Sequence, residues 1–265
     1  MADYGGGIGS MVGGEETFDA DMDHAIERGG ESLRAEIESF LTEHRLTVVF
    51  QPVVDLGSMQ RIGYEAFARV PGASQPPSVW FREARTEGLL EELELEAMRI
   101  ALSEADRFPD DVFIALNASP STAASTGIRD VIASFPFRRI VLDINEAAAI
   151  DDYPGLESAI DKLRGEGVRI ALDDAGSGST SLRHIAGVGP DFIKIDTSIT
   201  RGIDTDLSNQ AVAMALHSFG TRMGAVTIAE GIETEGELQM LASMGVQVGQ
   251  GYFLGHPEPV EKVLA

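Results

Sequence analysis

Short, continuously apolar runs alternate with segments of helical period from residue 47 onward. The clear runs cover residues 48–54, 113–117, 139–144, 168–174, 192–196 and 225–230, and weaker ones cover 62–69 and 246–252. Runs that are apolar throughout, rather than alternating, are typical of parallel strands buried on both faces. The pattern therefore predicts eight strands in a sheet that helices cover on its outer side.

The segments between these runs carry the spacing of amphipathic helices. Apolar residues recur every three or four positions in 95–105 and in 156–163, and Thr234 and Glu237 have the spacing of a capping box, with Gly245 as a stop. Eight strand–helix steps in about 215 residues predict a (β/α)8 barrel. A doubly wound open sheet is the competing architecture.

The N-terminal part differs in composition from the rest. Six of the first fourteen residues are Gly, and the following residues are acidic with few apolar positions, which predicts a flexible leader over residues 1–30. Leu33, Ile37 and Leu41 then predict a short helix at the start of a domain over 31–265.

Charge and composition exclude several classes of function. The chain has 20 Lys and Arg against 43 Asp and Glu, a formal net charge of −23, and such a field repels a nucleic-acid polymer. The absence of Cys excludes disulfides, thiolate metal sites and cysteine nucleophiles. No apolar run approaches a membrane span and the start is no signal peptide, so we expect a soluble cytoplasmic protein.

Polar residues gather at the ends of the predicted strands. They are Glu65, Asn117, Asp143, Asp173, Asp174, Lys194, Asp196, Glu230 and Gln250. In a parallel barrel these ends converge on one rim, although a lone carboxylate there is often only a helix cap. Packed carboxylates need cations between them, and hard oxygen ligands favour Mg²⁺ or Mn²⁺. Two such ions would suit attack of water on a phosphodiester.

Other catalytic devices are missing from the sequence. GxSxG, HExxH, Walker and GxGxxG motifs do not occur. The Gly-rich stretch 176–181 could cradle a phosphate, but we interpret it as a connecting loop.

Eight motifs in order resemble the EAL domain family, the bacterial phosphodiesterases of cyclic di-GMP. They are FQPVVDL (50–56), GYEAFAR (63–69), LNASP (116–120), VLDINE (141–146), LDDAGSGSTSL (172–182), FIKID (192–196), IAEGIET (228–234) and GQGYFLGHP (249–257). The resemblance covers about residues 46–263. It implies a barrel whose first strand is antiparallel to the others, and a homodimer.

The resemblance also implies roles for individual residues. It implies two Mg²⁺ or Mn²⁺ ions, and the residues that would act as their ligands are Glu65, Asn117, Asp143, Asp173, Asp174 and Glu230. Lys194 would orient the attacking water and act in catalysis with Glu65, Asp173 and Glu230. Contacts with the substrate would come from Gln51, Arg69, Asp196 and Gln250, and Glu146 would order the loop after the fifth strand.

The sequence departs from the family pattern at several positions. Phe67 replaces the Leu of the signature triplet, which changes packing only, and Asn145 replaces a common Thr. Asp143 replaces the usual Glu, which shortens the arm of a presumed ligand by about 1.5 Å. Ala175 and Ser179 stand where aromatic residues are common, which removes apolar contacts from the loop.

Three hypotheses about function follow from these residues. The first is a metal-dependent phosphodiesterase that opens cyclic di-GMP to linear pGpG. The second is a binding module that holds the dinucleotide without cleaving it, which Asp143 and the altered loop favour. The third is an unrelated metal-dependent barrel enzyme, such as a lyase.

Overall fold

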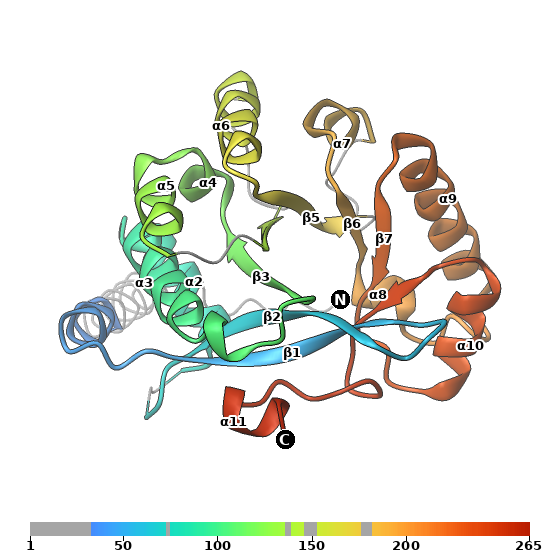
Figure 1. Cartoon of the computed structure of the whole chain (residues 1–265), viewed down its shortest axis with the longest axis horizontal. Coiled ribbons are helices and arrows are strands. Elements are labelled where there is room, and N and C mark those ends of the chain that lie inside the picture. The colour runs from blue at the N-terminus through green and yellow to red at the C-terminus, as the bar shows by residue number, and fades with distance from the viewer. Residues whose placement is uncertain (1–32, 73–74, 136–138, 146–152, 176–181) are drawn as a thin grey trace, which may run out of the picture.

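Eight strands close into a barrel in the order β1 to β8 (Figure 1). The computed structural model describes residues 33–72, 75–135, 139–145, 153–175 and 182–265, so the predicted leader lies outside the described residues. The strands are β1 (Thr47–Asp55), β2 (Arg61–Arg69), β3 (Phe113–Ala118), β4 (Ile140–Asn145), β5 (Arg169–Ala175), β6 (Phe192–Ile195), β7 (Val226–Ala229) and β8 (Val248–Gly249). The closed barrel confirms the predicted architecture and excludes the open sheet.

The first strand runs against both of its neighbours. β1 pairs antiparallel with β2 and with β8, whereas every pair from β2–β3 to β7–β8 is parallel. This confirms the antiparallel first strand. Because β2 to β8 share one direction, their carboxyl ends lie at one rim of the barrel, where the predicted polar residues meet.

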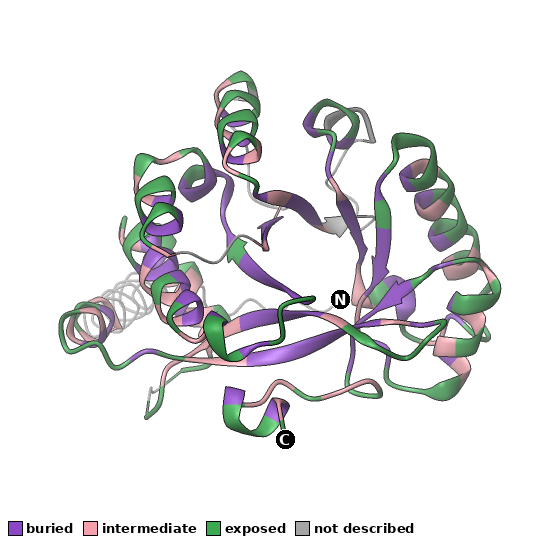
Figure 2. Ribbon diagram, in the orientation of Figure 1, coloured by how far each residue is buried: buried purple, intermediate pink, exposed green. Residues whose placement is uncertain are grey.

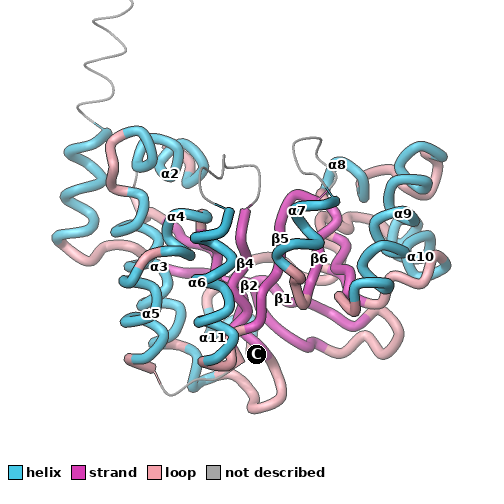
Figure 3. Tube along the Cα trace, turned by 90° about the horizontal axis from the view of Figure 1, so that it is seen from above, coloured by secondary structure: helices cyan, strands magenta, loops and turns pink. Residues whose placement is uncertain are grey.

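Helices surround the barrel on its outer side (Figures 1 and 3). They are a helix over residues 33–42, then α2 (Pro77–Thr86), α3 (Leu90–Ser103), α4 (Pro120–Ala124), α5 (Thr126–Ala133), α6 (Tyr153–Gly165), α7 (Leu182–Val188), α8 (Thr197–Thr200), α9 (Leu207–Met223), α10 (Glu235–Ser243) and α11 (Val260–Val263), with a 3₁₀ turn at η1 (Ala105–Arg107). None of the described helices is both long enough and apolar enough to cross a membrane.

The strands bury both faces, as their apolar runs predict (Figure 2). In β3, Phe113 and Ala115 point into a small cluster inside the barrel, and Ile114 and Leu116 belong to the larger cluster between strands and helices. The period of two along a strand divides consecutive apolar residues between the two cores. This packing fixes the register that sets the position of each strand-end side chain.

A third apolar cluster lies outside the barrel. The helix over residues 33–42 contributes Ile37 and Phe40, which pack with Trp80 of α2 and Leu93 of α3. The rings of Phe40 and Trp80 meet edge to face, with centroids 4.9 Å apart. The N-terminal helix is therefore held by a core of its own.

Candidate functional site

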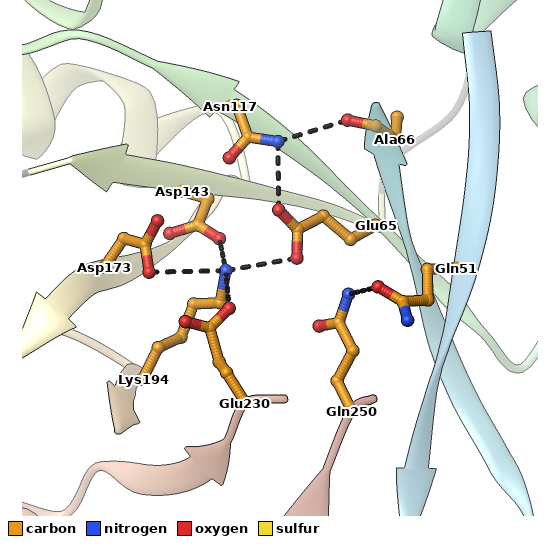
Figure 4. A network of polar contacts seen from close by, with 9 residues as sticks. All are labelled: Gln51, Glu65, Ala66, Asn117, Asp143, Asp173, Lys194, Glu230 and Gln250. Carbon is orange, nitrogen blue, oxygen red and sulfur yellow. Dashed lines mark hydrogen bonds and ion pairs between the residues drawn. The ribbon is translucent and has the colours of Figure 1, made fainter. Parts of the chain in front are cut away.

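Five strands bring charged side chains to one point at the carboxyl rim (Figure 4). Nζ of Lys194 lies 3.1 Å from Oε2 of Glu65, 2.5 Å from Oδ2 of Asp143, 3.6 Å from Oδ1 of Asp173 and 2.6 Å from Oε1 of Glu230. The ammonium group is thus the common partner of four carboxylates, and we call these five residues the acidic cluster.

The acidic cluster is buried to different depths. Lys194, Glu65 and Asp143 are only 2–3% exposed, whereas the side chains of Asp173 and Glu230 are 18% and 17% exposed. The carboxylates of Glu65 and Asp143 therefore contact the ammonium group on its buried side, and those of Asp173 and Glu230 lie next to the solvent.

Burial and mutual repulsion shift the protonation of the acidic cluster. Burial raises the pKa of Asp143 to about 8, against the attraction of Lys194. Burial likewise raises the pKa of Glu230 well above its ordinary value. Burial alone would lower the pKa of Lys194, but the surrounding carboxylates outweigh it and raise the pKa. Lys194 therefore carries a firmly held positive charge amid excess negative charge.

Asn117 belongs to the same network. Its amide nitrogen donates to Oε1 of Glu65 at 3.0 Å and to the carbonyl of Ala66 at 3.1 Å. Asn117 and Asp143 are opposite each other in the parallel pair β3–β4, and the hydrogen bonds fix the orientation of the Glu65 carboxylate.

Two glutamines lie beside the acidic cluster. Nε2 of Gln250 donates to Oε1 of Gln51 at 2.9 Å, and Nε2 of Gln51 donates to the carbonyl of Gly255 at 2.9 Å. Both side chains are buried, and Oε1 of Gln250 has no hydrogen-bond partner among the described residues. Figure 4 shows the pair next to Glu65 and Glu230. The strand pattern placed Gln250 at this rim, whereas Gln51 came from the family resemblance, and their contacts with a substrate stay predictions.

A cavity of about 370 Å³ opens over the acidic cluster. Glu65, Asn117, Asp173, Lys194 and Glu230 line its charged part. Its second part, the apolar arm, runs outward between β2 and the helices α2 and α3, where Phe67, Phe81 and Met98 supply apolar surface beside a few charged side chains. The site thus combines a charged floor with an apolar arm that can hold a larger ligand.

The lining of the apolar arm contains residues that the sequence did not reveal. They include Phe81 and Arg85 of α2 and Glu94 of α3, together with Arg69, which was predicted. The two helices have apolar stripes, but their spacing alone does not say which strand they cover. Only the packed structure places these side chains in the cavity.

Glu94 is a buried carboxylate with a structural task. Its two oxygens each accept from the backbone N–H of Ser119 at 3.0 Å, and one accepts from the hydroxyl of Ser119 at 2.8 Å. Burial raises the pKa of Glu94. Since Ser119 caps α4, Glu94 anchors the turn that follows Asn117. Its position among leucines in α3 was a sequence signal for burial.

Three predicted site residues do not belong to the acidic cluster as the structure describes it. The carboxylate of Asp196 accepts from the backbone N–H of Ser198 at 2.9 Å and caps α8, which is the ordinary role considered for a lone strand-end carboxylate. Glu146 lies outside the described residues, and so does the side chain of Asp174. The roles of both stay predictions.

The donor set fits a divalent cation by its chemistry. Four carboxylates face one ammonium group, and Oδ1 of Asp143 is buried without a hydrogen-bond partner among the described residues. Such an oxygen is costly to bury unless a cation satisfies it. In the part of the chain that the structure describes, however, no three acidic or histidine side chains are arranged so that they could bind one metal ion. Lys194 is the group on which the carboxylates converge.

A closed barrel, parallel from β2 to β8, thus carries an acidic rim around a buried lysine. The sequence profile of the EAL domain matches residues 34–257. The chain belongs to the EAL domain family, as the eight motifs indicated.

Several bacterial proteins resemble this chain in sequence. The probable cyclic di-GMP phosphodiesterase PdeD of Escherichia coli is 28% identical over 239 residues, which cover 86% of this chain and 44% of that protein. The cyclic di-GMP phosphodiesterase PdeB of Shewanella oneidensis is 27% identical over 256 residues, which cover 91% and 30%. The chain thus spans less than half the length of these relatives.

Solved structures share the fold. The PaMucR phosphodiesterase in its c-di-GMP complex superposes with a TM-score of 0.77 at 26% identity, covering 88% of this chain and 99% of that one. The EAL domain of Xanthomonas citri FimX, in complex with c-diGMP, superposes with a TM-score of 0.78 at 22% identity, covering 89% and 97%.

Proposed function

We propose that this chain is a metal-dependent phosphodiesterase that hydrolyses cyclic di-GMP to linear pGpG. The observation that carries the proposal is the acidic cluster at the floor of the cavity, in a chain of the EAL family whose relatives include cyclic di-GMP phosphodiesterases. The homodimer and the cytoplasmic location implied by the sequence are part of the same proposal.

The residues that would hold two Mg²⁺ or Mn²⁺ ions are Glu65, Asn117, Asp143, Asp173, Asp174 and Glu230. When bound, the ions would supply positive charge for the phosphate and lower the pKa of a water molecule. Hard oxygen donors and the unsatisfied oxygen of Asp143 support this assignment.

The chain's own groups prepare the reaction. Lys194 is fixed by its carboxylate partners and stays protonated, so it can orient a water molecule and balance charge on the phosphate. Asn117 fixes the Glu65 carboxylate, and Arg69 in the cavity wall offers a guanidinium to the substrate. Gln51 and Gln250 offer amide groups beside the site.

The chemical step balances as a simple hydrolysis. The water oxygen forms a bond to one phosphorus, the bond from that phosphorus to the 3′ oxygen breaks, and the leaving oxygen takes up a proton. The ring opens to a linear dinucleotide with a 5′ phosphate. The apolar arm would shelter part of the nucleotide while the phosphate lies over the charged floor.

The deciding experiment is incubation with cyclic di-GMP in Mn²⁺ and in EDTA, with products separated by chromatography. We expect pGpG in Mn²⁺ only, and none from a Glu65→Ala variant that retains the wild-type circular dichroism spectrum. If Glu65→Ala turns over as fast as the wild type, the reaction takes place elsewhere.

A second candidate is a receptor that binds cyclic di-GMP without cleaving it. The depth of Asp143 favours it, because this carboxylate is held against Lys194 and does not line the cavity. Asp143→Glu extends the arm by about 1.5 Å and should raise turnover if the short arm limits metal binding. Ligand binding in EDTA without product in Mn²⁺, from both proteins, would establish the receptor.

A further inference from the structure

A second cavity of about 300 Å³ lies at the amino end of the parallel strands, opposite the acidic cluster. Its wall includes Asp55 at the end of β1, Asp111 before β3 and Gln247 before β8, and the aromatic rings of Phe113 and Phe192. Of the residues in its wall, Asp55 and Phe192 fall within the eight family motifs, and the others lie outside them.

Arg169, the first residue of β5, lies at the centre of this cavity's wall. Its Cζ lies 5.1 Å from the ring centroid of Phe113 and 5.1 Å from that of Phe192. The two centroids are 5.5 Å apart, so the guanidinium packs against one side of the ring pair. Burial lowers the pKa of Arg169, and the charge of Asp191 offsets part of this effect. The contact with the rings restricts the side chain of Arg169, which also lines the cavity.

The guanidinium of Arg169 contacts the two rings but has no hydrogen-bond or ion-pair partner among the described residues. Within the described ranges it donates no hydrogen bond and forms no ion pair within 4.0 Å. Nearby Asp191 is engaged by the backbone N–H of Ile170 at 2.8 Å, and one oxygen of Asp55 accepts from Ser58. A half-buried arginine with five donors and no acceptor is a group that a ligand can satisfy.

The charges around the cavity select the kind of ligand. The cavity wall contains one guanidinium and two carboxylates, those of Asp55 and Asp111, so a simple anion would meet net repulsion and a simple cation would leave Arg169 unsatisfied. A ligand that carries a carboxylate and an ammonium group satisfies both signs. The cavity volume suits a small molecule of this type.

We propose that this cavity binds a small zwitterion of the α-amino acid type. The ligand carboxylate lies against Arg169, and its ammonium group faces Asp55 and Asp111. The site is independent of cyclic di-GMP, since it lies at the opposite end of the barrel.

The test is a two-dimensional amide NMR titration with L-alanine, and with propionate and ethylammonium, which each carry one half of the charge pair. We expect L-alanine to shift the amide signals of Phe113, Phe192 and Gln247, and each half to bind about ten-fold more weakly or worse. Arg169→Met should abolish the L-alanine shifts. Arg222→Met, which removes an exposed cation from the end of α9, is the matched control and should leave them unchanged.

Several outcomes would overturn the proposal. Equal L-alanine titrations of Arg169→Met and wild type would exclude Arg169, and absence of shifts would exclude the site. If propionate binds as tightly as L-alanine, the cavity is a plain anion site. If circular dichroism shows that Arg169→Met does not fold, Asp111→Asn carries the test. Asp111 is exposed, and its replacement should weaken the binding of L-alanine without weakening the binding of propionate. Any other result counts against a zwitterion site.

Discussion

Lys194 is surrounded by more negative charge than it can neutralise. Four carboxylates share one ammonium, and two of them, Glu65 and Asp143, are almost fully buried with it. Buried charges are tolerated only when they are paired. The lysine therefore stabilises the fold as well as serving the proposed chemistry.

Replacing this lysine should be costly. Lys194→Met leaves the carboxylates without their common partner, and we expect the free energy of unfolding in EDTA to fall by about 3–5 kcal/mol. Mn²⁺ should restore a large part of the loss, because a cation can take over the charge. Urea unfolding in EDTA and in Mn²⁺ measures both effects.

The control for this substitution is Lys162→Met, which changes an exposed lysine of α6 and should shift stability by less than about 0.5 kcal/mol. If Lys194→Met is as stable as the wild type in EDTA, the four carboxylates are neutralised by other means.

The sequence predicted which residues reach the rim, but not how they pair. Strand period and barrel geometry are enough to place Glu65, Asp143 and Glu230 at one end. The distances to Lys194 depend on rotamers set by packing, which no local pattern contains. Likewise, no strand pattern shows that the carboxylate of Asp196 accepts from the backbone N–H of Ser198 and caps α8; its expected contact with the substrate stays a prediction.

At the scale of the element, the start of α10 shows how a few hydrogen bonds set a boundary. Thr234 Oγ1 accepts from the N–H of Glu237, whose carboxylate accepts from the N–H groups of Thr234, Glu233 and Gly202. This confirms the predicted capping box. Because one partner comes from the segment after α8, the box also ties two connections together.

The stabilisation by Glu237 should depend on pH. Burial alone would raise its pKa, but the backbone N–H donors hold the pKa below the ordinary 4.5. The contribution is therefore present above pH 4.5 and is lost as the pH falls through the lowered pKa. We expect Glu237→Gln to lower the free energy of unfolding by about 1 kcal/mol at neutral pH, with a difference that shrinks in acid. Urea unfolding at several pH values tests this, and a difference independent of pH would contradict it.

The turn after β8 needs a glycine for lack of space. A Cβ on Gly251 would lie 2.2 Å from both the backbone N and O of Ile232, and backbone atoms cannot yield as a flexible side chain can. We expect Gly251→Ala to lower the free energy of unfolding by about 3 kcal/mol and to displace neighbouring Gln250. The stability of Gly251→Ala is measured by thermal unfolding beside that of Gly165→Ala, a control in which the added Cβ has no neighbour within 4 Å. Equal stability of the two variants would show that the turn can relax.

Most elements were predictable because their signals are local. The apolar runs gave the parallel strands, and Thr234 with Glu237 gave the start of α10. The short helices α4, α8 and α11 have too few residues to show a period. The direction of β1 came from the resemblance, since an apolar run has the same pattern in either orientation.

At the scale of the whole molecule, the net charge of −23 opposes the approach of a doubly charged dinucleotide. Salt screens such repulsion, because the Debye length is about 10 Å at an ionic strength of 0.1 M. We expect the association rate constant of cyclic di-GMP to rise as NaCl increases from low to physiological concentration, measured by stopped-flow in the presence of Mg²⁺. Uncharged guanosine should show no such trend. A rate that falls with salt would mean that the positive charge of the loaded site outweighs the global field.

The cluster that anchors the helix over residues 33–42 has a spectroscopic consequence. The chain has a single tryptophan, and Trp80 is fully buried against Phe40 outside the barrel, with its indole N–H lacking a partner among the described residues. Its emission should be blue-shifted, and it reports on the docking of the N-terminal helix rather than on the barrel. Fluorescence and far-ultraviolet circular dichroism thus follow two different parts of the protein, so a helix that undocks first separates the two unfolding curves.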